Sequence, residues 1–328
     1  MTAEPTVDEA PALEAAAAAP DHASPRARTR HTLLSDSAQL FKVRVTAMVV
    51  ITAWAGFYLG SVRSGIPTLH MGLVETLLGI ALISAGASAL NEVLERKSDA
   101  NMLRTRSRPL ASGRISLAHG LLAAFASTAL GSLMLLRFTN PVTVVLGLLT
   151  VFTYVAVYTP LKYRSTLATF VGAFPGAMGP LLGWTAARGR IEWPAVALFA
   201  ILFVWQFPHF MAIAWLYRDD YGRAGIQMLP VVQPDGWSTV VEALAYAVIM
   251  LPVSLLPWWL HIAGGIYAAA ALVLGLYYLT YTVRFAKILK APSFAHSRPY
   301  ARALLRASVL YLPLLLIVMM LDATQGRR

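Results

Sequence analysis

The chain has 328 residues, of which 57% are hydrophobic and only 13% are charged, and its mean hydropathy is +0.61. A soluble protein this apolar would have too little polar surface to cover its core, whereas repeated apolar runs of about 20 residues are typical of membrane-spanning helices. The absence of cysteine excludes disulfides, zinc-thiolate sites and thiol nucleophiles. The net charge of +11 is explained more simply by loop charges that set membrane topology than by a nucleic-acid partner, and we expect no such partner.

The N-terminal segment, residues 1–38, differs in composition from the rest of the chain. It is rich in alanine, proline and acidic residues and contains no long apolar run. A basic stretch followed by an apolar one is missing, so the segment does not have the pattern of a secretory signal. We expect a disordered cytoplasmic tail over 1–38 and one intramembrane domain over 39–328.

Nine apolar segments follow the tail, at roughly 43–62, 72–94, 115–136, 141–160, 167–187, 194–217, 238–258, 262–285 and 303–322. Pro175 and Pro180 interrupt the fifth segment, which helical bundles tolerate because neighbouring helices satisfy the freed backbone groups. The sequence therefore predicts an all-α, polytopic membrane protein, with nine transmembrane helices packed in a lipid bilayer.

The distribution of lysine and arginine predicts the orientation of these helices. If the N-terminus is inside, 21 of the 27 basic residues fall in the tail and in the loops on its side, and 6 fall on the other side. Such a bias is typical of cytoplasmic loops. We expect a multi-pass protein of the inner (plasma) membrane, with a cytoplasmic N-terminus and an outside C-terminus.

Acidic side chains gather in two of the predicted cytoplasmic loops, where topology does not require them. After the second apolar segment, Asn91, Glu95 and Asp99 are spaced i, i+4 and i+8, which places them in one row on a helix. Carboxylate and amide oxygens are suitable ligands for Mg²⁺. Arg104 and Arg108 follow, and their guanidinium groups suit phosphate oxygens. Acidic side chains that suit a metal ion, next to basic side chains that suit phosphate, indicate a diphosphate site.

An alternative is a helix end that only carries ion pairs, such as Glu92 with Arg96, each worth a few tenths of a kcal/mol. A second acidic cluster on the same side favours the site. Asp219 and Asp220 lie in "WLYRDDYGRAG" (215–225) after the sixth segment, and two acidic patches would form a two-metal clamp on a diphosphate. Asp235, in "QPDG", is more typical of a turn.

The first loop, "NEVLERKSDANMLRTRSRPL" (91–110), resembles the intramembrane prenyltransferases of the UbiA superfamily. The segments "YTPLKYRSTLATFVGAFPGAMGPLLGW" (158–184) and "WQFPHFMAIAWLYRDDYGRAGIQMLPVV" (205–232) resemble its haem branch rather than its quinone branches. The resemblance covers about residues 40–322, and it implies a UbiA-type bundle with a central cavity that opens near the cytoplasmic face. Glu95 stands where the family often has aspartate, which keeps the carboxylate.

The resemblance also implies substrates and roles. The implied substrates are farnesyl diphosphate and haem b. Mg²⁺ would assist ionisation of the diphosphate, and a vinyl group of haem b would then receive the farnesyl group to give haem O. One ion would be held by Asn91, Glu95 and Asp99, and a second near Asp219 and Asp220. The expected substrate-binding residues are Arg104, Arg108, Lys162 and Arg164 for the phosphates, Tyr158 and Tyr221 for the allylic cation, and His209 for haem.

His209 lies inside the sixth apolar segment, where an ionisable residue is a functional candidate and a neutral imidazole can bind haem iron. A histidine hydrogen-bonded inside the bundle is the alternative. Two other functions also stay open: a UbiA-type enzyme with another aromatic acceptor, such as a quinone or chlorophyll-like precursor, and a transporter, which would require acids at the bilayer midplane. Pathway logic adds a haem A synthase or a terminal oxidase assembly as a partner.

Overall fold

The computed structural model describes residues 32–65, 67–68 and 71–324, and residues from Leu34 onward form one compact unit. Regular structure in the described ranges is helical apart from one β-bridge between Ala263 and Ala323. The elements in chain order are α1 (Leu33–Leu40), α2 (Val43–Ser64), α3 (Met71–Ala100), α4 (Leu117–Phe138), α5 (Pro141–Phe152), η1 (Thr153–Tyr158), α6 (Thr159–Leu161), α7 (Ala168–Arg188), α8 (Trp193–Leu216), α9 (Arg218–Arg223), α10 (Leu229–Val232), α11 (Trp237–Trp259), α12 (Gly265–Phe285), η2 (Ala286–Lys290) and α13 (Phe294–Leu321).

The predicted apolar segments correspond to α2, α3, α4, the run from α5 to α6, α7, α8, α11, α12 and α13. Within the described residues, eight helices are long and apolar enough to cross a membrane. α7 is the remaining segment, and its two prolines and four glycines lower its hydropathy. The prediction of an all-α, polytopic membrane protein is therefore confirmed.

The glycines of α7 have a packing role that explains why this less apolar helix belongs to the bundle. A Cβ atom on Gly183 would collide with the backbone oxygen of Ala53 in α2, and a Cβ on Gly56 would collide with that of Pro180 in α7. Small residues of this kind let two membrane helices approach closely. The contact fixes α2 against α7. It thereby also fixes the position of Lys42, the residue that precedes α2.

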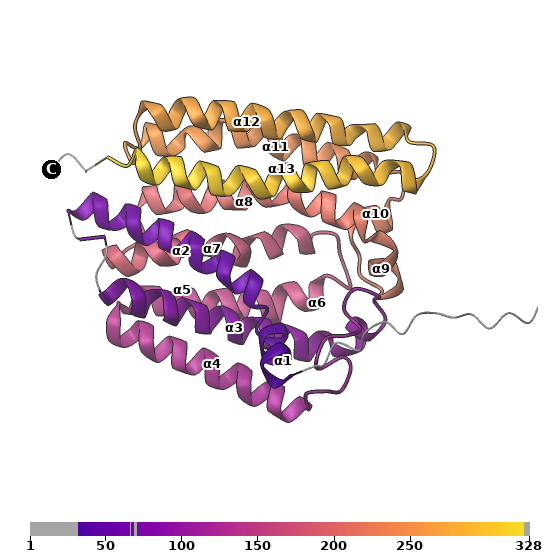
Figure 1. The fold of residues 1–328 in the computed structure, drawn as a ribbon, viewed down its shortest axis with the longest axis horizontal. Helices are drawn as coiled ribbons and strands as arrows, with labels where there is room; N and C mark the ends of the chain where they lie inside the picture. The colour runs from indigo at the N-terminus through magenta and orange to yellow at the C-terminus, as the bar shows by residue number, and fades with distance from the viewer. Residues whose placement is uncertain (1–31, 66, 69–70, 325–328) are drawn as a thin grey trace, which may run out of the picture. The chain divides into compact units, whose positions relative to one another are not determined.

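Figure 1 shows α11, α12 and α13 beside α8, and α3, α4 and α5 together below them, with α2 and α7 between the two groups. The segments that follow α3, α8 and α12 all lie at one end of the bundle, on the right in this view. Both acidic loops therefore share one end of the bundle, as the sequence predicts. Large fully buried side chains such as Trp184, Tyr267 and Tyr278 fill the packed interior.

Helix α1 begins inside the segment predicted as a tail over 1–38. Residues 34–38 are part of α1 and of the compact unit, and residues 1–31 of the predicted tail lie outside the described residues. Asp36 in α1 is 6% exposed and accepts a hydrogen bond of 3.0 Å from Nε of Arg114. This buried pairing, which the sequence did not reveal, holds α1 on the segment between α3 and α4.

Candidate active site

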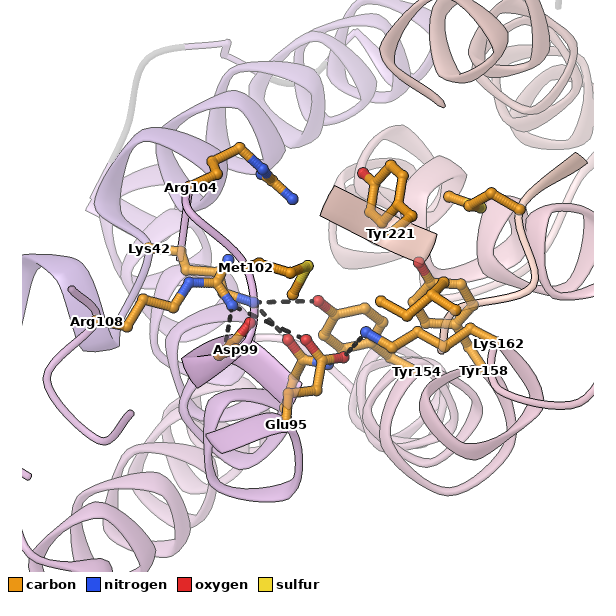
Figure 2. A pocket seen from close by; sticks show the side chains of 13 residues that line it. Lys42, Glu95, Asp99, Met102, Arg104, Arg108, Tyr154, Tyr158, Lys162 and Tyr221 are labelled. Atoms are coloured by element: carbon orange, nitrogen blue, oxygen red, sulfur yellow. Dashed lines mark hydrogen bonds and ion pairs between the residues drawn. The ribbon is translucent and has the colours of Figure 1, made fainter. Parts of the chain in front are cut away.

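The row predicted on α3 lies on the wall of a cavity of about 140 Å³ (Figure 2). Asn91, Glu95 and Asp99 are 1%, 5% and 0% exposed. Because one helical turn separates each from the next, their polar groups reach the same cavity. The rest of its wall consists of Lys42, Met102, Arg104, Arg108, Tyr154, Tyr158, Lys162, Tyr221, Ile226 and Met228.

Basic side chains already contact both carboxylates of the row. Lys162 donates a hydrogen bond to Oε1 of Glu95, and Arg108 donates one of 2.7 Å to Oδ2 of Asp99. Arg108 also lies 3.8 Å from Oε2 of Glu95. The second oxygen of Asp99, Oδ1, is buried and has no hydrogen-bond partner within the described part of the chain. A buried carboxylate oxygen without a partner is costly, so this atom is available to a ligand.

Lys42 is a site residue that the sequence analysis did not identify. It directly precedes α2 in a left-handed conformation (φ 44°), and its ammonium group donates to Oδ1 of Asn91 and, at 3.5 Å, to the hydroxyl of Tyr154. Burial lowers the pKa of Lys42 to about 8, repulsion from Arg108 adds to this, and attraction to Glu95 opposes it. In the sequence, its position before the first membrane helix indicates only a basic residue that helps to set the membrane topology.

The cavity wall carries an excess of positive charge. Four basic side chains and two carboxylates line it, which gives a formal charge of +2. Burial lowers the pKa of Lys162, although Glu95 favours its charged form. Burial also disfavours the charged form of Arg108, but the attraction of Asp99 and Glu95 outweighs it and raises the pKa of Arg108. A positively charged cavity of this kind attracts a compact polyanion.

Aromatic rings form the other side of the cavity. Tyr154 and Tyr158 lie on η1, a π-helical turn, and their rings stack with centroids 5.6 Å apart and planes 11° apart. π-helical turns inside α-helices are frequent at functional sites. Tyr221 comes from α9, and the guanidinium of Arg104 lies 5.8 Å from the centroid of its ring. Tyr158 and Tyr221 thus line the cavity together with the row on α3.

The second acidic cluster does not reach this cavity in the structure. The side chain of Asp219 is 67% exposed, and its Oδ1 lies 3.9 Å from Nε of Arg218. Asp220 is 8% exposed, accepts a hydrogen bond of 3.2 Å from the backbone N–H of Leu103, and pairs with Arg223. The structure thus joins the second cluster to the first loop, while a second metal near Asp219 and Asp220 stays a prediction.

Buried acids hold the arginine-bearing segment between α3 and α4 at both ends. Asp220 anchors Leu103, and Oε1 of Glu92 accepts a hydrogen bond of 3.1 Å from the N–H of Leu110. Glu92 is fully buried, and Arg96 donates to the carbonyl of Val93 instead, so the suggested Glu92–Arg96 pair is not formed. Arg104 and Arg108 lie between the two anchors, which therefore position their side chains.

Two further candidate residues lie outside the cavity wall. Arg164 is exposed. His209 is packed inside the bundle, where its Nδ1 lies 2.7 Å from Oγ of Ser308 and its ring stacks on Trp205 with centroids 4.8 Å apart. This is the arrangement expected of a histidine hydrogen-bonded inside the bundle. Phosphate contact by Arg164 and haem contact by His209 stay predictions.

The row on α3 has the donor set that suits Mg²⁺. It offers two carboxylates and one amide oxygen, together with the unpartnered Oδ1 of Asp99. Mg²⁺ usually takes one or two carboxylates, keeps several waters, and completes its coordination with substrate phosphate. Within the described residues, no three His, Cys, Asp or Glu side chains form a metal-binding cluster. The residues therefore fit an ion shared with a substrate rather than one enclosed by protein.

Comparisons with known proteins agree with this geometry. The sequence model described as the UbiA prenyltransferase family matches residues 49–296. A protoheme IX farnesyltransferase of Koribacter versatilis is 53% identical over 293 residues, covering 89% of this chain and 94% of that protein. A protein of the same name from Salinibacter ruber is 40% identical, covering 88% of this chain and 99% of its own length.

Solved structures show the same fold. A structure described for digeranylgeranylglyceryl phosphate synthase superposes with a TM-score of 0.70 at 18% identity, covering 88% of this chain and 98% of that one. A UbiA homologue from Archaeoglobus fulgidus, bound to GPP and Mg²⁺, gives 0.55 at 16% identity, covering 87% and 99%. With its sequence relatives, its helical fold and the row on α3, the chain belongs to the UbiA prenyltransferase family.

Proposed function

We propose that this prenyltransferase transfers the farnesyl group of farnesyl diphosphate to a vinyl group of haem b, giving haem O. The observation that carries the proposal is the cavity in which the Asn91–Glu95–Asp99 row faces an excess of basic side chains. The choice of donor and acceptor rests on the names of the relatives, which cover nearly the whole chain. Family membership leaves no support for the transporter alternative.

In this proposal the row on α3 would hold Mg²⁺, with a second ion at Asp219 and Asp220, and the metal would supply Lewis acidity toward the diphosphate. The basic residues have a double role. Lys162 and Arg108 lie against Glu95 and Asp99 in the structure. Carboxylates that held an ion would release Lys162 and Arg108, and the charged donors of these two residues suit phosphate oxygens. Lys42 and Arg104 complete the phosphate contacts.

The carbon–oxygen bond of the donor breaks with its electron pair leaving on the diphosphate. The resulting allylic cation lies against aromatic faces, which stabilise positive charge, and the stacked rings of Tyr154 and Tyr158 offer such faces. The vinyl π electrons of haem b then form the new carbon–carbon bond. A water molecule captures the porphyrin-side cation and releases one proton, which leaves the hydroxyl of haem O.

The size of the cavity limits what it holds in this state. About 140 Å³ suits a diphosphate group, whereas pockets that hold drug-sized molecules are about 300–1,000 Å³. The cavity must therefore widen when the acceptor binds. Tyr154 and Tyr158 line the cavity from a π-helical turn rather than from regular α-helix, and such turns are frequent at functional sites.

We also propose that the protein lies in the plasma membrane with its N-terminus and active site on the cytoplasmic side and its C-terminus outside. The bias of basic residues toward the end that carries the site supports this orientation. The haem product is poorly soluble in water, so a haem A synthase or a terminal oxidase assembly in the same bilayer is the proposed receiving partner.

Product analysis tests the proposal directly. Purified protein is incubated with Mg²⁺, farnesyl diphosphate and either haem b or 4-hydroxybenzoate, and the products are identified by mass spectrometry. We expect haem O, no prenylated benzoate, and no product when the metal is removed by a chelator. Prenylated benzoate without haem O would establish another aromatic acceptor, and product formation without Mg²⁺ would contradict the role of the row on α3.

A further inference from the structure

A second cavity, of about 510 Å³, lies between the end of α12 and the start of α13. Both helix ends are at the end of the bundle that carries the candidate active site (Figure 1). Lys287, Lys290 and His296 line the cavity together with Tyr300, and Val283 and Pro292 belong to its apolar wall. We call this cavity the lysine cleft. None of its residues lines the active-site cavity.

The backbone aligns the two lysines of the cleft. They belong to η2, a 3₁₀ helix with three residues per turn, so residues three apart lie one above the other. Ile288, between them, is 4% exposed and packs in the main hydrophobic core. Burial of Ile288 fixes the rotation of η2, and this fixes the side on which Lys287 and Lys290 lie.

The other wall of the lysine cleft is the first turn of α13, a helix of 28 residues. Its N-cap residue, Ser293, makes no side-chain cap hydrogen bond, and Oγ of Ser293 lies 2.8 Å from Nδ1 of His296 instead. The N–H groups at the start of a helix carry partial positive charge and are a favourable place for an anion. His296 and Tyr300 are one turn apart and therefore share a face of α13.

The lysine cleft has no acidic residue on the segments that form its walls. The sequence contains no aspartate or glutamate between Glu242 and Asp322. In the described ranges of the chain, no ion pair involves Lys287, Lys290 or His296. Two lysines and a histidine thus line one cavity beside the start of α13. That combination suits a phosphate group.

The apolar wall indicates what the phosphate is attached to. The two helices beside the cleft that are long and apolar enough to cross a membrane are Gly265–Lys290 and Phe294–Leu321, so the cleft lies between their ends, where basic residues are expected near the membrane surface. Val283, one turn deeper, is 55% exposed on the helix surface. Basic pockets between membrane helices are suited to anionic lipid head groups. We propose that the lysine cleft binds the phosphate of an anionic phospholipid, whose acyl chain lies along α12 beside Val283.

Two double variants of the full-length protein test this site. Lys287→Gln/Lys290→Gln removes two charges from the cleft. Arg302→Gln/Arg306→Gln removes two charges from exposed positions on α13 that do not line the lysine cleft. Binding is measured by native mass spectrometry of lipid retained from mixed phosphatidylglycerol and phosphatidylcholine vesicles. Thermal shift with phosphatidylglycerol, phosphatidylcholine or inorganic phosphate alone provides a second measurement.

We expect selective retention of phosphatidylglycerol, weakened about 100-fold by the lysine variant, since each charge-assisted hydrogen bond to a phosphate oxygen contributes about tenfold. The arginine variant is expected to change retention less than about threefold. Equal losses in both variants would show general surface attraction, and equal retention of the two lipids would show no anion site. Lysine-dependent stabilisation by inorganic phosphate without any by phosphatidylglycerol would assign the cleft to a soluble phosphate. Each of these results would overturn the proposal, and none depends on the prenyl-transfer reaction.

Discussion

The last turns of α3 and the segment that follows α8 contain similar residues, acids beside basic side chains, and yet the structure uses them differently. On α3, Glu95 and Asp99 lie against the cavity and are paired with Lys162 and Arg108. After α8, Asp219 is exposed to solvent and Asp220 binds the backbone of the other segment. Burial explains the difference, because a buried carboxylate needs partners whereas an exposed one is stabilised by water. A pattern of acidic residues therefore predicts where a site lies. The burial of each carboxylate determines which contacts it makes when no substrate is bound.

The comparison also separates folding from chemistry. Asp99 contributes to both, since its loss would leave the largely buried Arg108 without its closest partner. Asp219 makes no such contact, so an effect of its replacement would report on the reaction alone. The two acidic clusters can therefore be distinguished by measuring activity and thermal stability on the same variants.

The largest expected effect is that of Asp99→Asn. We expect prenyl transfer to fall by about 100-fold or more, the size found when one group that stabilises transition-state charge is removed. The melting temperature is also expected to fall, because the neutral amide pairs poorly with Arg108. Mass spectrometry of the product and a thermal melt of the same preparation provide both readouts. Activity close to that of the unmodified protein would disprove the role of the row on α3.

Asp219→Ala is expected to lower activity by a similar factor, about 100-fold, if the second ion binds at this cluster as proposed. Its melting temperature should stay unchanged, because substitutions at exposed positions usually alter stability by less than about 0.5 kcal/mol. A loss of only a fewfold would mean that the second cluster does not bind metal. The cluster would then act through Asp220, which holds Leu103 in place.

Much of this architecture could be predicted from the sequence, because local patterns determine it. Runs of apolar residues predict the membrane helices, and the spacing of Asn91, Glu95 and Asp99 predicts their common row. Contacts between distant segments could not be predicted in this way. Lys42 is 49 residues from Asn91 in the sequence, and only the packing of α2 against α7 and α3 brings its ammonium group to the site.

The buried anchors were missed for the same reason. Glu92 has Arg96 at the spacing of a helical ion pair, and this local spacing suggests a pairing that the structure does not contain. The π-helical turn η1 is not visible in the apolar pattern either, because its residues continue the run of α5. Sequence periodicity determines which face a residue occupies, whereas its partner depends on the tertiary fold.

Lys42→Gln tests whether the first site extends beyond the row on α3. We expect kcat/KM for farnesyl diphosphate to fall by about 30-fold, since a charge-assisted hydrogen bond contributes about 1.5–3 kcal/mol. Arg106→Gln is the matched control, because Arg106 is an exposed basic residue at the same end of the bundle that does not line the cavity. Its effect should be less than about twofold. An equal loss in both variants would show general attraction of the substrate to this end of the bundle rather than contact with Lys42.

The smallest expected effect belongs to Glu92, which touches no substrate and positions the segment that carries Arg104 and Arg108. Removal of its buried hydrogen bond to Leu110 in Glu92→Ala loosens that segment, and we expect KM for farnesyl diphosphate to rise about tenfold with little change in kcat. Glu92→Gln retains an acceptor oxygen at the same position and should preserve most of the affinity. A purely structural role would instead lower the amount of folded enzyme and leave its KM unchanged. Equal KM values in both variants and the unmodified protein would therefore show that the anchor near Asp220, rather than Glu92, positions the arginines.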